Sequence, residues 1–154
     1  MNSVLCNGCR VVIGLAMVGT LALVSLSPAV YTEEIAQDSS STWSGVFTEE
    51  QADRGKATYD QECAACHLDD LLGDGIAPSL IGVPFSFRWS ELSLGDMFMA
   101  IRTTMPQGAP ASLSVKDYVD IVAYILKANE FPAGDSELPT DEDSLSEIII
   151  DEKP

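Results

Sequence analysis

The sequence predicts an all-α fold, with three main helices joined by long loops in one small domain. Three segments combine a capping residue with apolar residues at helical spacing, and few residues alternate between apolar and polar as a strand would require. Glycine and proline punctuate the stretches between those segments, which predicts structured loops. Such a domain has a small hydrophobic core, so we expect a bulky group to fill its interior.

The first helix is predicted from about Thr48 to Glu62. Its first residue is followed three positions later by Gln51, which is a capping-box pattern, and the two glutamates between them suit the positive end of the helix dipole. We expect Tyr59 of this helix to meet Tyr124 where the first and last helices cross beside Gly55.

A second helix is predicted over residues 93–105 and a third over 114–129. Each starts with a serine that has an aspartate three positions later, again a capping pattern. Apolar residues then recur at helical spacing: Leu94, Met97, Phe98 and Ile101 in the second helix, and Tyr118, Ile121, Val122, Ile125 and Leu126 in the third. Residues 67–89 contain three glycines and two prolines, so we predict a loop there.

Residues 1–29 differ from the rest, because Arg10 is their only charge. A run of apolar and small residues follows it, and Ser27 and Ala29 then form the small-residue exit typical of a cleaved secretory signal peptide. The alternative is an uncleaved membrane anchor, since the uncharged run is long enough to span a bilayer. In both cases we expect the domain to be exported to the periplasm.

The remaining sequence divides into a polar linker at residues 30–44, a domain at 45–134 and an acidic C-terminal extension at 135–154. All 24 acids and 7 of the 8 bases follow residue 29, so this part carries a formal charge of −17. Phosphates would repel it, which argues against nucleic acid as a partner. The charge is compatible with a partner protein that presents a basic patch, and the alternative is that it serves the solubility of an exported protein alone. Because isoleucines 148–150 are costly to leave in water, we expect the extension to pack on the domain, and the alternative is a solvated acidic end.

The only histidine of the chain, His67, directly follows Cys63 and Cys66 in the motif C-x-x-C-H. This motif is the attachment site of haem c. Two intervening residues place the thiols about one helical turn apart, so both can form thioethers with the vinyl groups on one edge of the porphyrin. The next residue then faces the iron, which an imidazole nitrogen binds. We therefore predict one covalent haem c, with His67 as an axial ligand of its iron.

Three other interpretations of the two cysteines are weaker. A zinc site needs four ligands, and the remaining cysteines, Cys6 and Cys9, precede the apolar run and would stay inside the cell or be removed. A thioredoxin-like pair is expected in a βαβ setting, which the sequence does not predict. A structural disulfide across two residues is strained and would leave the histidine unexplained.

The second axial position of the iron is left to a lysine or a methionine, of which methionine is the usual ligand. We predict Met105, which stands beside Pro106 at the end of the second helix and so begins a loop, where ligands are commonly found. Met97 and Met99 are the alternatives, although a methionine inside a helix is more often core filler.

Three further residues are predicted near the haem. The backbone carbonyl of Pro78 is expected to accept the second N–H of His67 and so orient the ring. Arg88 and Trp89 are expected to donate to the haem propionates, with a plain core position as the alternative for the tryptophan.

The segments "YDQECAACHLDDLLGDGIAPSLIG", "TMPQGAP" and "LSVKDYVDIVAYILKANEFPAG" together resemble a class I mono-haem cytochrome c. The order of the parts carries the resemblance: the attachment site is early, the methionine loop is in the middle and the amphipathic helix is last. In addition, "WSGVFTEEQADRG" and "SELPTDEDSLSEI" resemble the cytochromes that accompany quinoprotein (pyrroloquinoline quinone) alcohol dehydrogenases. The resemblance covers about Trp43 to Ile150 and implies a small cytochrome c-like fold wrapped around one covalent haem.

The resemblance implies an exported one-electron carrier with no catalytic residue of its own. Its donor would be a periplasmic quinoprotein dehydrogenase on a separate chain, and its acceptor a terminal oxidase or another cytochrome. Two alternatives stay open: a haem-bearing subunit permanently bound in a membrane or dehydrogenase complex, and an open-site haem enzyme or sensor in which Met105 does not bind. Contact with a membrane is expected only if the N-terminal segment stays uncleaved.

Overall fold

The structure, a computed structural model, describes residues 40–152, so the predicted signal or anchor lies outside the described residues. In chain order the elements are β1 (Ser40–Ser41), the 3-10 helix η1 (Thr42–Ser44), α1 (Glu49–Glu62), α2 (Ala64–His67), α3 (Val83–Trp89), α4 (Leu94–Thr104), α5 (Val115–Ala128), α6 (Glu142–Ser146) and β2 (Ile148–Ile149). The three longest helices, α1, α4 and α5, stand where the sequence predicts them, which confirms the all-α fold. Within the described residues, no helix has the length and apolar character needed to cross a membrane.

Each of the three long helices begins with the cap that the sequence predicts. Thr48, Ser93 and Ser114 are the N-caps, and the hydroxyl of each accepts a hydrogen bond from the amide three residues later. The box is complete at Ser93, because the carboxylate of Asp96 also accepts from the serine backbone. These contacts satisfy amides that have no partner inside the helix.

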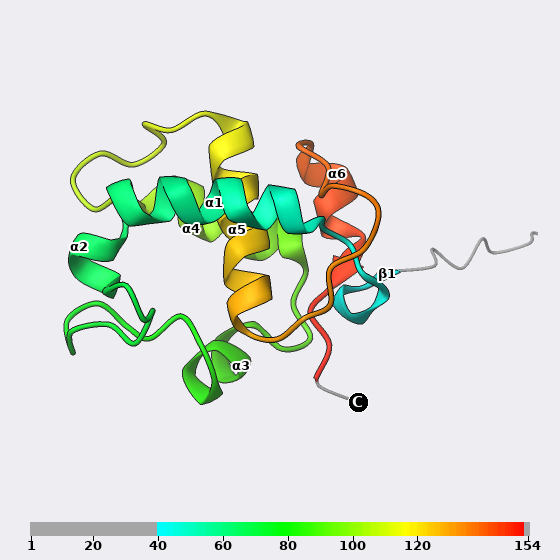
Figure 1. The fold of residues 1–154 in the computed structure, drawn as a ribbon, viewed down its shortest axis with the longest axis horizontal. Helices are drawn as coiled ribbons and strands as arrows, with labels where there is room; N and C mark the ends of the chain where they lie inside the picture. The colour runs from blue at the N-terminus through cyan, green and yellow to red at the C-terminus, as the bar shows by residue number, and fades with distance from the viewer. Residues whose placement is uncertain (1–39, 153–154) are drawn as a thin grey trace, which may run out of the picture. The chain divides into compact units, whose positions relative to one another are not determined.

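Helices α1 and α5 make the most extensive helix contact of the described residues, and they cross beside Gly55 (Figure 1). A Cβ atom at Gly55 would lie 1.8 Å from the backbone oxygen of Asp120, so only glycine lets the two backbones approach this closely. One turn further along α1, Tyr59 meets Tyr124 as predicted, with 5.2 Å between the ring centroids.

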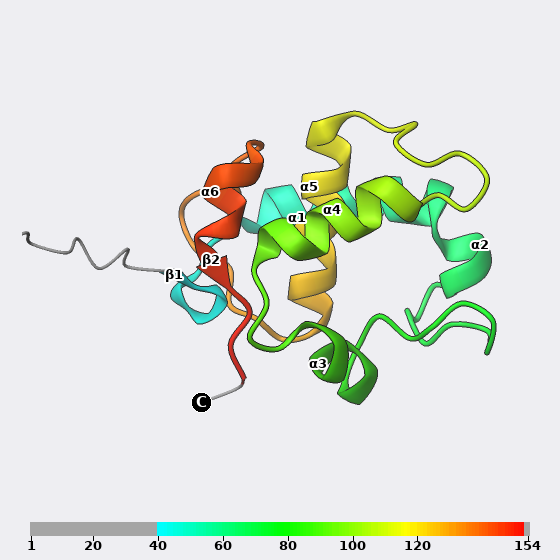
Figure 2. The same cartoon turned by 180° about the vertical axis from the view of Figure 1, so that it is seen from behind.

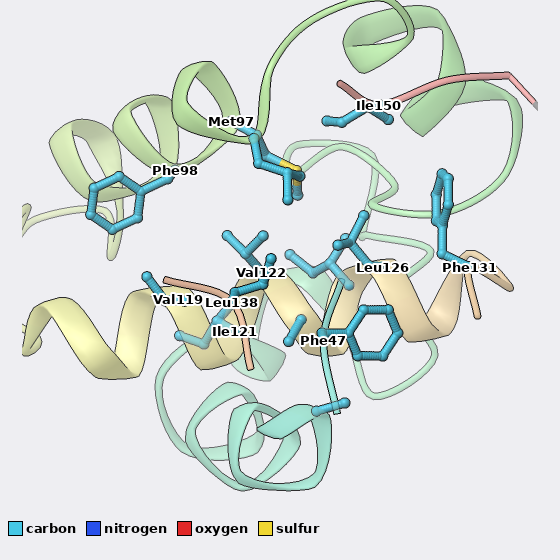
Figure 3. Packing of buried hydrophobic residues seen from close by; sticks show 14 of the residues in the cluster. Phe47, Met97, Phe98, Val119, Ile121, Val122, Leu126, Phe131, Leu138 and Ile150 are labelled. Atoms are coloured by element: carbon cyan, nitrogen blue, oxygen red, sulfur yellow. The ribbon is translucent and has the colours of Figure 1, made fainter. Parts of the chain in front are cut away.

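The hydrophobic core lies between α1, α4, α5 and the C-terminal segment (Figure 3). Met97 of α4 points toward α5 in this view. Helix α5 supplies the largest share of the buried apolar residues: Tyr118, Val119, Ile121, Val122, Ala123, Ile125 and Leu126. Because one face of α5 meets α1 and another meets α4, this helix is the centre of the domain.

The predicted loop over residues 67–89 is wrong in its last third, because Val83–Trp89 forms α3. The helix begins after Gly82, whose φ of 66° lies in the region that favours glycine. Pro84 stands in the first turn, where a proline costs no helical hydrogen bond. The residues that suggested a loop therefore form the helix start. Phe85 and Trp89, one turn apart, face the core.

The acidic extension packs on the domain, as its isoleucines predict. Strand β2 pairs in parallel with β1, with Ser40 beside Ile148, and α6 packs on α4. Leu145 and Ile150 are buried there. Figures 1 and 2 agree in placing α6 and the β1–β2 pair together at the end of the domain away from α2. The range predicted as a linker thus includes residues in regular structure from Ser40 onward.

Candidate functional site

A mostly apolar cavity opens beside α2. Its volume is about 220 Å³. All five helices from α1 to α5 contribute to the wall. The apolar part of that wall includes Leu80, Phe85, Trp89, Met97, Ile101, Ile121 and Ile125.

The C-x-x-C-H motif stands at this cavity on a single helical turn. Cys63 ends α1 and begins α2, and its carbonyl accepts hydrogen bonds from the amides of Cys66, at 3.1 Å, and His67, at 3.0 Å. The turn places all three side chains on the cavity wall. Its far end is fixed from α1, because the Tyr59 hydroxyl donates to the carbonyl of Leu68 at 2.7 Å.

His67 is buried, and its ring orientation is set by the loop that follows α2. Nδ1 of the imidazole lies 2.9 Å from the backbone oxygen of Pro78. A carbonyl oxygen can only accept, so Nδ1 carries the proton and the lone pair is left on Nε2. An imidazole held in this way presents Nε2 as a metal ligand, which is the usual arrangement of a ligating histidine and its backbone partner.

The two cysteines are both free thiols in the structure, one partly buried and one exposed. Burial raises the pKa of Cys63 to about 11, with a smaller contribution from the nearby charge of Glu62. A redox-active dithiol needs the opposite shift, because the thiolate is its reactive form. Within residues 40–152, no three His, Cys, Asp or Glu side chains are grouped as a metal site. Cys6 and Cys9 lie outside the described residues.

Met105 lines the cavity at the point where α4 ends. Its amide donates to the carbonyl of Ile101 at 2.8 Å, and its own carbonyl accepts from the hydroxyl of Tyr118, also at 2.8 Å. Of the alternative methionines, Met97 is among the lining residues and is buried in the core, whereas Met99 is not among them. The cavity therefore brings together the motif and two of the three candidate methionines.

Of the other three predicted site residues, two line the cavity and one does not. Pro78 and Trp89 line the cavity, and the tryptophan is also part of the hydrophobic core. Arg88 is exposed and does not line the cavity; its guanidinium lies 4.7 Å from the centre of the Trp89 ring. The arginine is therefore placed at the outer face of a residue that forms the wall.

Sequence reasoning missed most of the apolar wall. Ile121 and Ile125 of α5, like Met97 and Ile101 of α4, are pairs four residues apart that lie on one face of a helix. The same spacing predicts a core stripe, and only the packing of the helices decides which part of a stripe faces a neighbour and which part faces a cavity. Tyr59, predicted as a helix contact, also lines the wall.

These residues fit a haem c. A flat macrocycle needs an apolar slot, two thiols at one edge and a nitrogen ligand beneath its centre. The cavity supplies the slot, Cys63 and Cys66 stand together on its wall, and the free Nε2 of His67 belongs to the same helical turn. Met105 provides a thioether sulfur from a different element.

The described lining of the cavity carries acidic side chains but no lysine or arginine. Glu62 and Asp74 are among the lining residues, and both are exposed. Hydrogen bonds from the amides of Ala77 and Ile76 lower the pKa of Asp74, which keeps it ionised. Lys127 lies away from the cavity, because it pairs with Glu49 and Asp53 near the N-terminal end of α1, whereas Glu62 is at the C-terminal end of that helix.

Comparison with known proteins adds three findings. Residues 50–125 match the family model described as "Cytochrome C oxidase, cbb3-type, subunit III". This segment runs from the first turn of α1 through the C-x-x-C-H motif and Met105 into α5. No curated protein matches the sequence.

Among solved structures, the sulfane dehydrogenase SoxCD from Paracoccus pantotrophus matches with a TM-score of 0.48 and 20% sequence identity. The match covers 70% of this chain and 61% of the SoxCD chain.

Proposed function

Because this chain carries a c-type cytochrome domain with covalently bound haem c and its iron, we propose that it is an exported mono-haem electron carrier of the periplasm. It accepts single electrons from a periplasmic quinoprotein dehydrogenase and passes them to a terminal oxidase or another cytochrome. The observation that carries the proposal is the placement of the only C-x-x-C-H motif of the chain on the wall of an apolar cavity that Met105 also lines.

Each residue of the site has one role in this proposal. Cys63 and Cys66 form the two thioethers, His67 binds the iron through Nε2, and Met105 binds it through sulfur. When bound, the haem supplies a one-electron couple, and a methionine ligand raises its potential. Pro78 holds the imidazole in one orientation by accepting its Nδ1 proton.

The remaining predicted residues act at the periphery of the haem. Trp89 supports the proposal as part of the cavity wall, from which its indole N–H can serve a propionate. The Arg88 guanidinium lies over the Trp89 ring, and a guanidinium in this position can still donate its in-plane N–H groups to a propionate. Neither residue takes part in binding the iron.

The acidic residues that line the cavity, Glu62 and Asp74, support the proposal that the partner protein has a basic surface. Glu62 and Asp74 stand where a redox partner must approach, since electron transfer needs close contact with the haem edge near the cysteines. A partner with a basic patch would be attracted to these charges and oriented by them. The donor and the acceptor are then expected to share one docking face and to use it in turn.

The family model favours a second candidate function. Its description names a subunit of an oxidase, so this chain can be proposed as a haem-bearing subunit held permanently in a larger complex. Purification from the native host in a mild detergent distinguishes the two. A carrier is recovered free, whereas a subunit co-purifies in a fixed ratio with other chains.

The ligand set is tested on full-length protein expressed with haem attachment. The double variant Cys63→Ser/Cys66→Ser should lose the haem that survives denaturing electrophoresis. Met105→Ala should keep the covalent haem but open the iron to carbon monoxide and lower the reduction potential. Met99→Ala is the matched control, because this methionine does not line the cavity. A Met105→Ala protein with unchanged spectrum and potential would move the second ligand to Met97.

A further inference from the structure

Tyr118 is a core residue of α5 that does not line the cavity but is bonded to a residue that does. Its side chain is 1% exposed. Its hydroxyl donates to the carbonyl oxygen of Met105 at 2.8 Å, across the loop that joins α4 to α5. A buried tyrosine hydroxyl needs a partner, and here the partner is the backbone of the proposed methionine ligand.

This bond fixes the second of the two peptide groups that flank the Met105 Cα. The first is fixed by α4, because the Met105 amide donates to Ile101 at 2.8 Å. A carbonyl just past the last turn of a helix has no partner inside that helix, so the Tyr118 hydroxyl supplies one. With both flanking peptide groups held, the direction in which the methionine side chain leaves the backbone is set.

The Tyr118 bond also connects the methionine to α5, which itself forms part of the cavity wall. Other bonds of the loop stay local: the amide of Ala109 donates to Pro106, and the amide of Ala111 donates back to Arg102 at the end of α4. The Tyr118 bond instead reaches α5, which supplies Ile121 to the cavity wall one turn later. The hydrogen bond thereby ties the backbone of Met105 to the helix that supplies Ile121 to the wall.

We propose that Tyr118 is a positioning residue for Met105: by holding the methionine carbonyl, it directs the thioether sulfur into the cavity and sets how readily that sulfur leaves the iron. This inference rests on the proposed function, because it takes Met105 to be the second axial ligand. It adds a determinant of ligand exchange that lies outside the C-x-x-C-H motif and the methionine loop.

The test removes one oxygen atom from the holoprotein. Tyr118→Phe keeps the buried ring but leaves the Met105 carbonyl without its donor. We expect the covalent haem to remain, the methionine–iron band at the red end of the ferric spectrum to weaken, and imidazole to bind the iron about tenfold more tightly, as the loss of one buried hydrogen bond implies. Imidazole titration followed by absorbance measures the change.

The control is Tyr124→Phe, which removes a hydroxyl from the same helix at a residue whose ring contacts Tyr59 and not the methionine loop. It should leave imidazole affinity unchanged. A Tyr118→Phe protein with a lower Tm but with wild-type band intensity and imidazole affinity would overturn the inference, because the hydroxyl would then serve stability alone.

A second measurement needs no variant. Coupling between two sites is reciprocal, so displacing Met105 with imidazole in the wild-type protein should speed exchange of the Tyr118 hydroxyl proton with solvent, as observed by NMR. Unchanged exchange would also overturn the positioning role.

The failure of this inference can be separated from failure of the proposed ligation. In the double variant Met105→Ala/Tyr118→Phe, imidazole affinity should equal that of Met105→Ala alone, because no methionine remains to be positioned. If Met105→Ala opens the iron and Tyr118→Phe does not, only the positioning role is wrong. If neither changes imidazole affinity, Met105 is not the ligand.

Discussion

Asp120 illustrates how single residues hold a charge inside this domain. Its carboxylate is almost fully buried at the α1–α5 crossing, where it accepts two hydrogen bonds from Arg54, at 3.0 and 3.2 Å, and one from Lys116, at 2.8 Å. Burial alone would raise the pKa of Asp120, but the hydrogen bonds from both bases outweigh burial and lower it. The folded pKa therefore lies below the unfolded value of about 3.9.

Stability contributed by a carboxylate with a lowered pKa is complete above its unfolded pKa and is lost as pH falls through the folded pKa. Asp120→Asn should lower the free energy of unfolding by about 2 kcal/mol at neutral pH. This is less than the roughly 3–5 kcal/mol of a fully buried pair, because solvent screens the partly exposed Arg54 and Lys116. The variant should also lose part of the wild-type decline in stability below about pH 4. Chemical denaturation across pH measures both effects.

The control is Asp60→Asn, which breaks an exposed pair with Lys56 on the surface of α1. This substitution should change the free energy of unfolding by no more than about 0.5 kcal/mol. Equal decreases in the free energy of unfolding in the two variants would mean that the burial of Asp120 adds nothing to the stability that its ion pairs provide.

Among the elements, the C-terminal extension is one whose removal should lower the stability of the domain. Leu138, Leu145, Ile148 and Ile150 are all buried against the rest of the domain. The extension is also bonded to α1, because the Leu138 amide donates to the side chain of Gln51 at 2.8 Å. Each fully buried side chain of this kind contributes about 1.5–3 kcal/mol.

Truncation after Gly134 should therefore lower the Tm of the holoprotein by at least about 10 °C. Glu142→Gln/Asp143→Asn is the control, since it removes two exposed charges of α6 and leaves the buried residues in place. An unchanged Tm after truncation would show that the packing contributes little and would leave the acids as the useful part of the extension.

The elements also show how far the sequence could predict the fold. Helices α1, α4 and α5 were predictable because their caps and apolar stripes are local signals. Helix α3 was missed because Gly82 and Pro84 look the same at a helix start as in a loop. The β1–β2 pair joins Ser40 to Ile148, and a two-residue strand carries no periodicity from which a partner so distant in sequence could be inferred.

The candidate site shows the same contrast between local sequence signals, which could be predicted, and contacts between distant residues, which could not. Cys63, Cys66 and His67 are adjacent in sequence, so their spacing alone predicts the haem attachment. Met105 could be ranked first because it stands at a helix end. The bond from Tyr118 depends on how α5 is rotated against the methionine loop, and a buried tyrosine in an apolar stripe looks like any other core residue.

At the scale of the whole molecule, acidic side chains lie both on the cavity wall and on α6, so the effect of their position on docking can be tested. Electron transfer to a basic partner should slow as salt rises, strongly at low ionic strength and weakly near physiological values, where the screening length is roughly 8 Å. Glu62→Gln/Asp74→Asn should reduce the low-salt rate, because both acids line the cavity. Stopped-flow mixing with the isolated partner measures the rate.

The α6 variant Glu142→Gln/Asp143→Asn changes the net charge by the same amount at the end of the domain away from α2 (Figures 1 and 2). It should slow the reaction less than the Glu62→Gln/Asp74→Asn variant does. Equal slowing would mean that net charge alone steers the partner, and a rate independent of salt would rule out electrostatic docking.

The parallel pairing of β1 with β2 has a practical consequence. It brings Ser40 and Ile149 to the same region, and this region lies away from α2 and the cavity beside it. A linker to a neighbouring module, or a tag that immobilises the protein on an electrode, can therefore be joined before Ser40 without covering the cavity. An attachment at the β1–β2 end of the domain would therefore leave the side that carries α2 accessible to a redox partner.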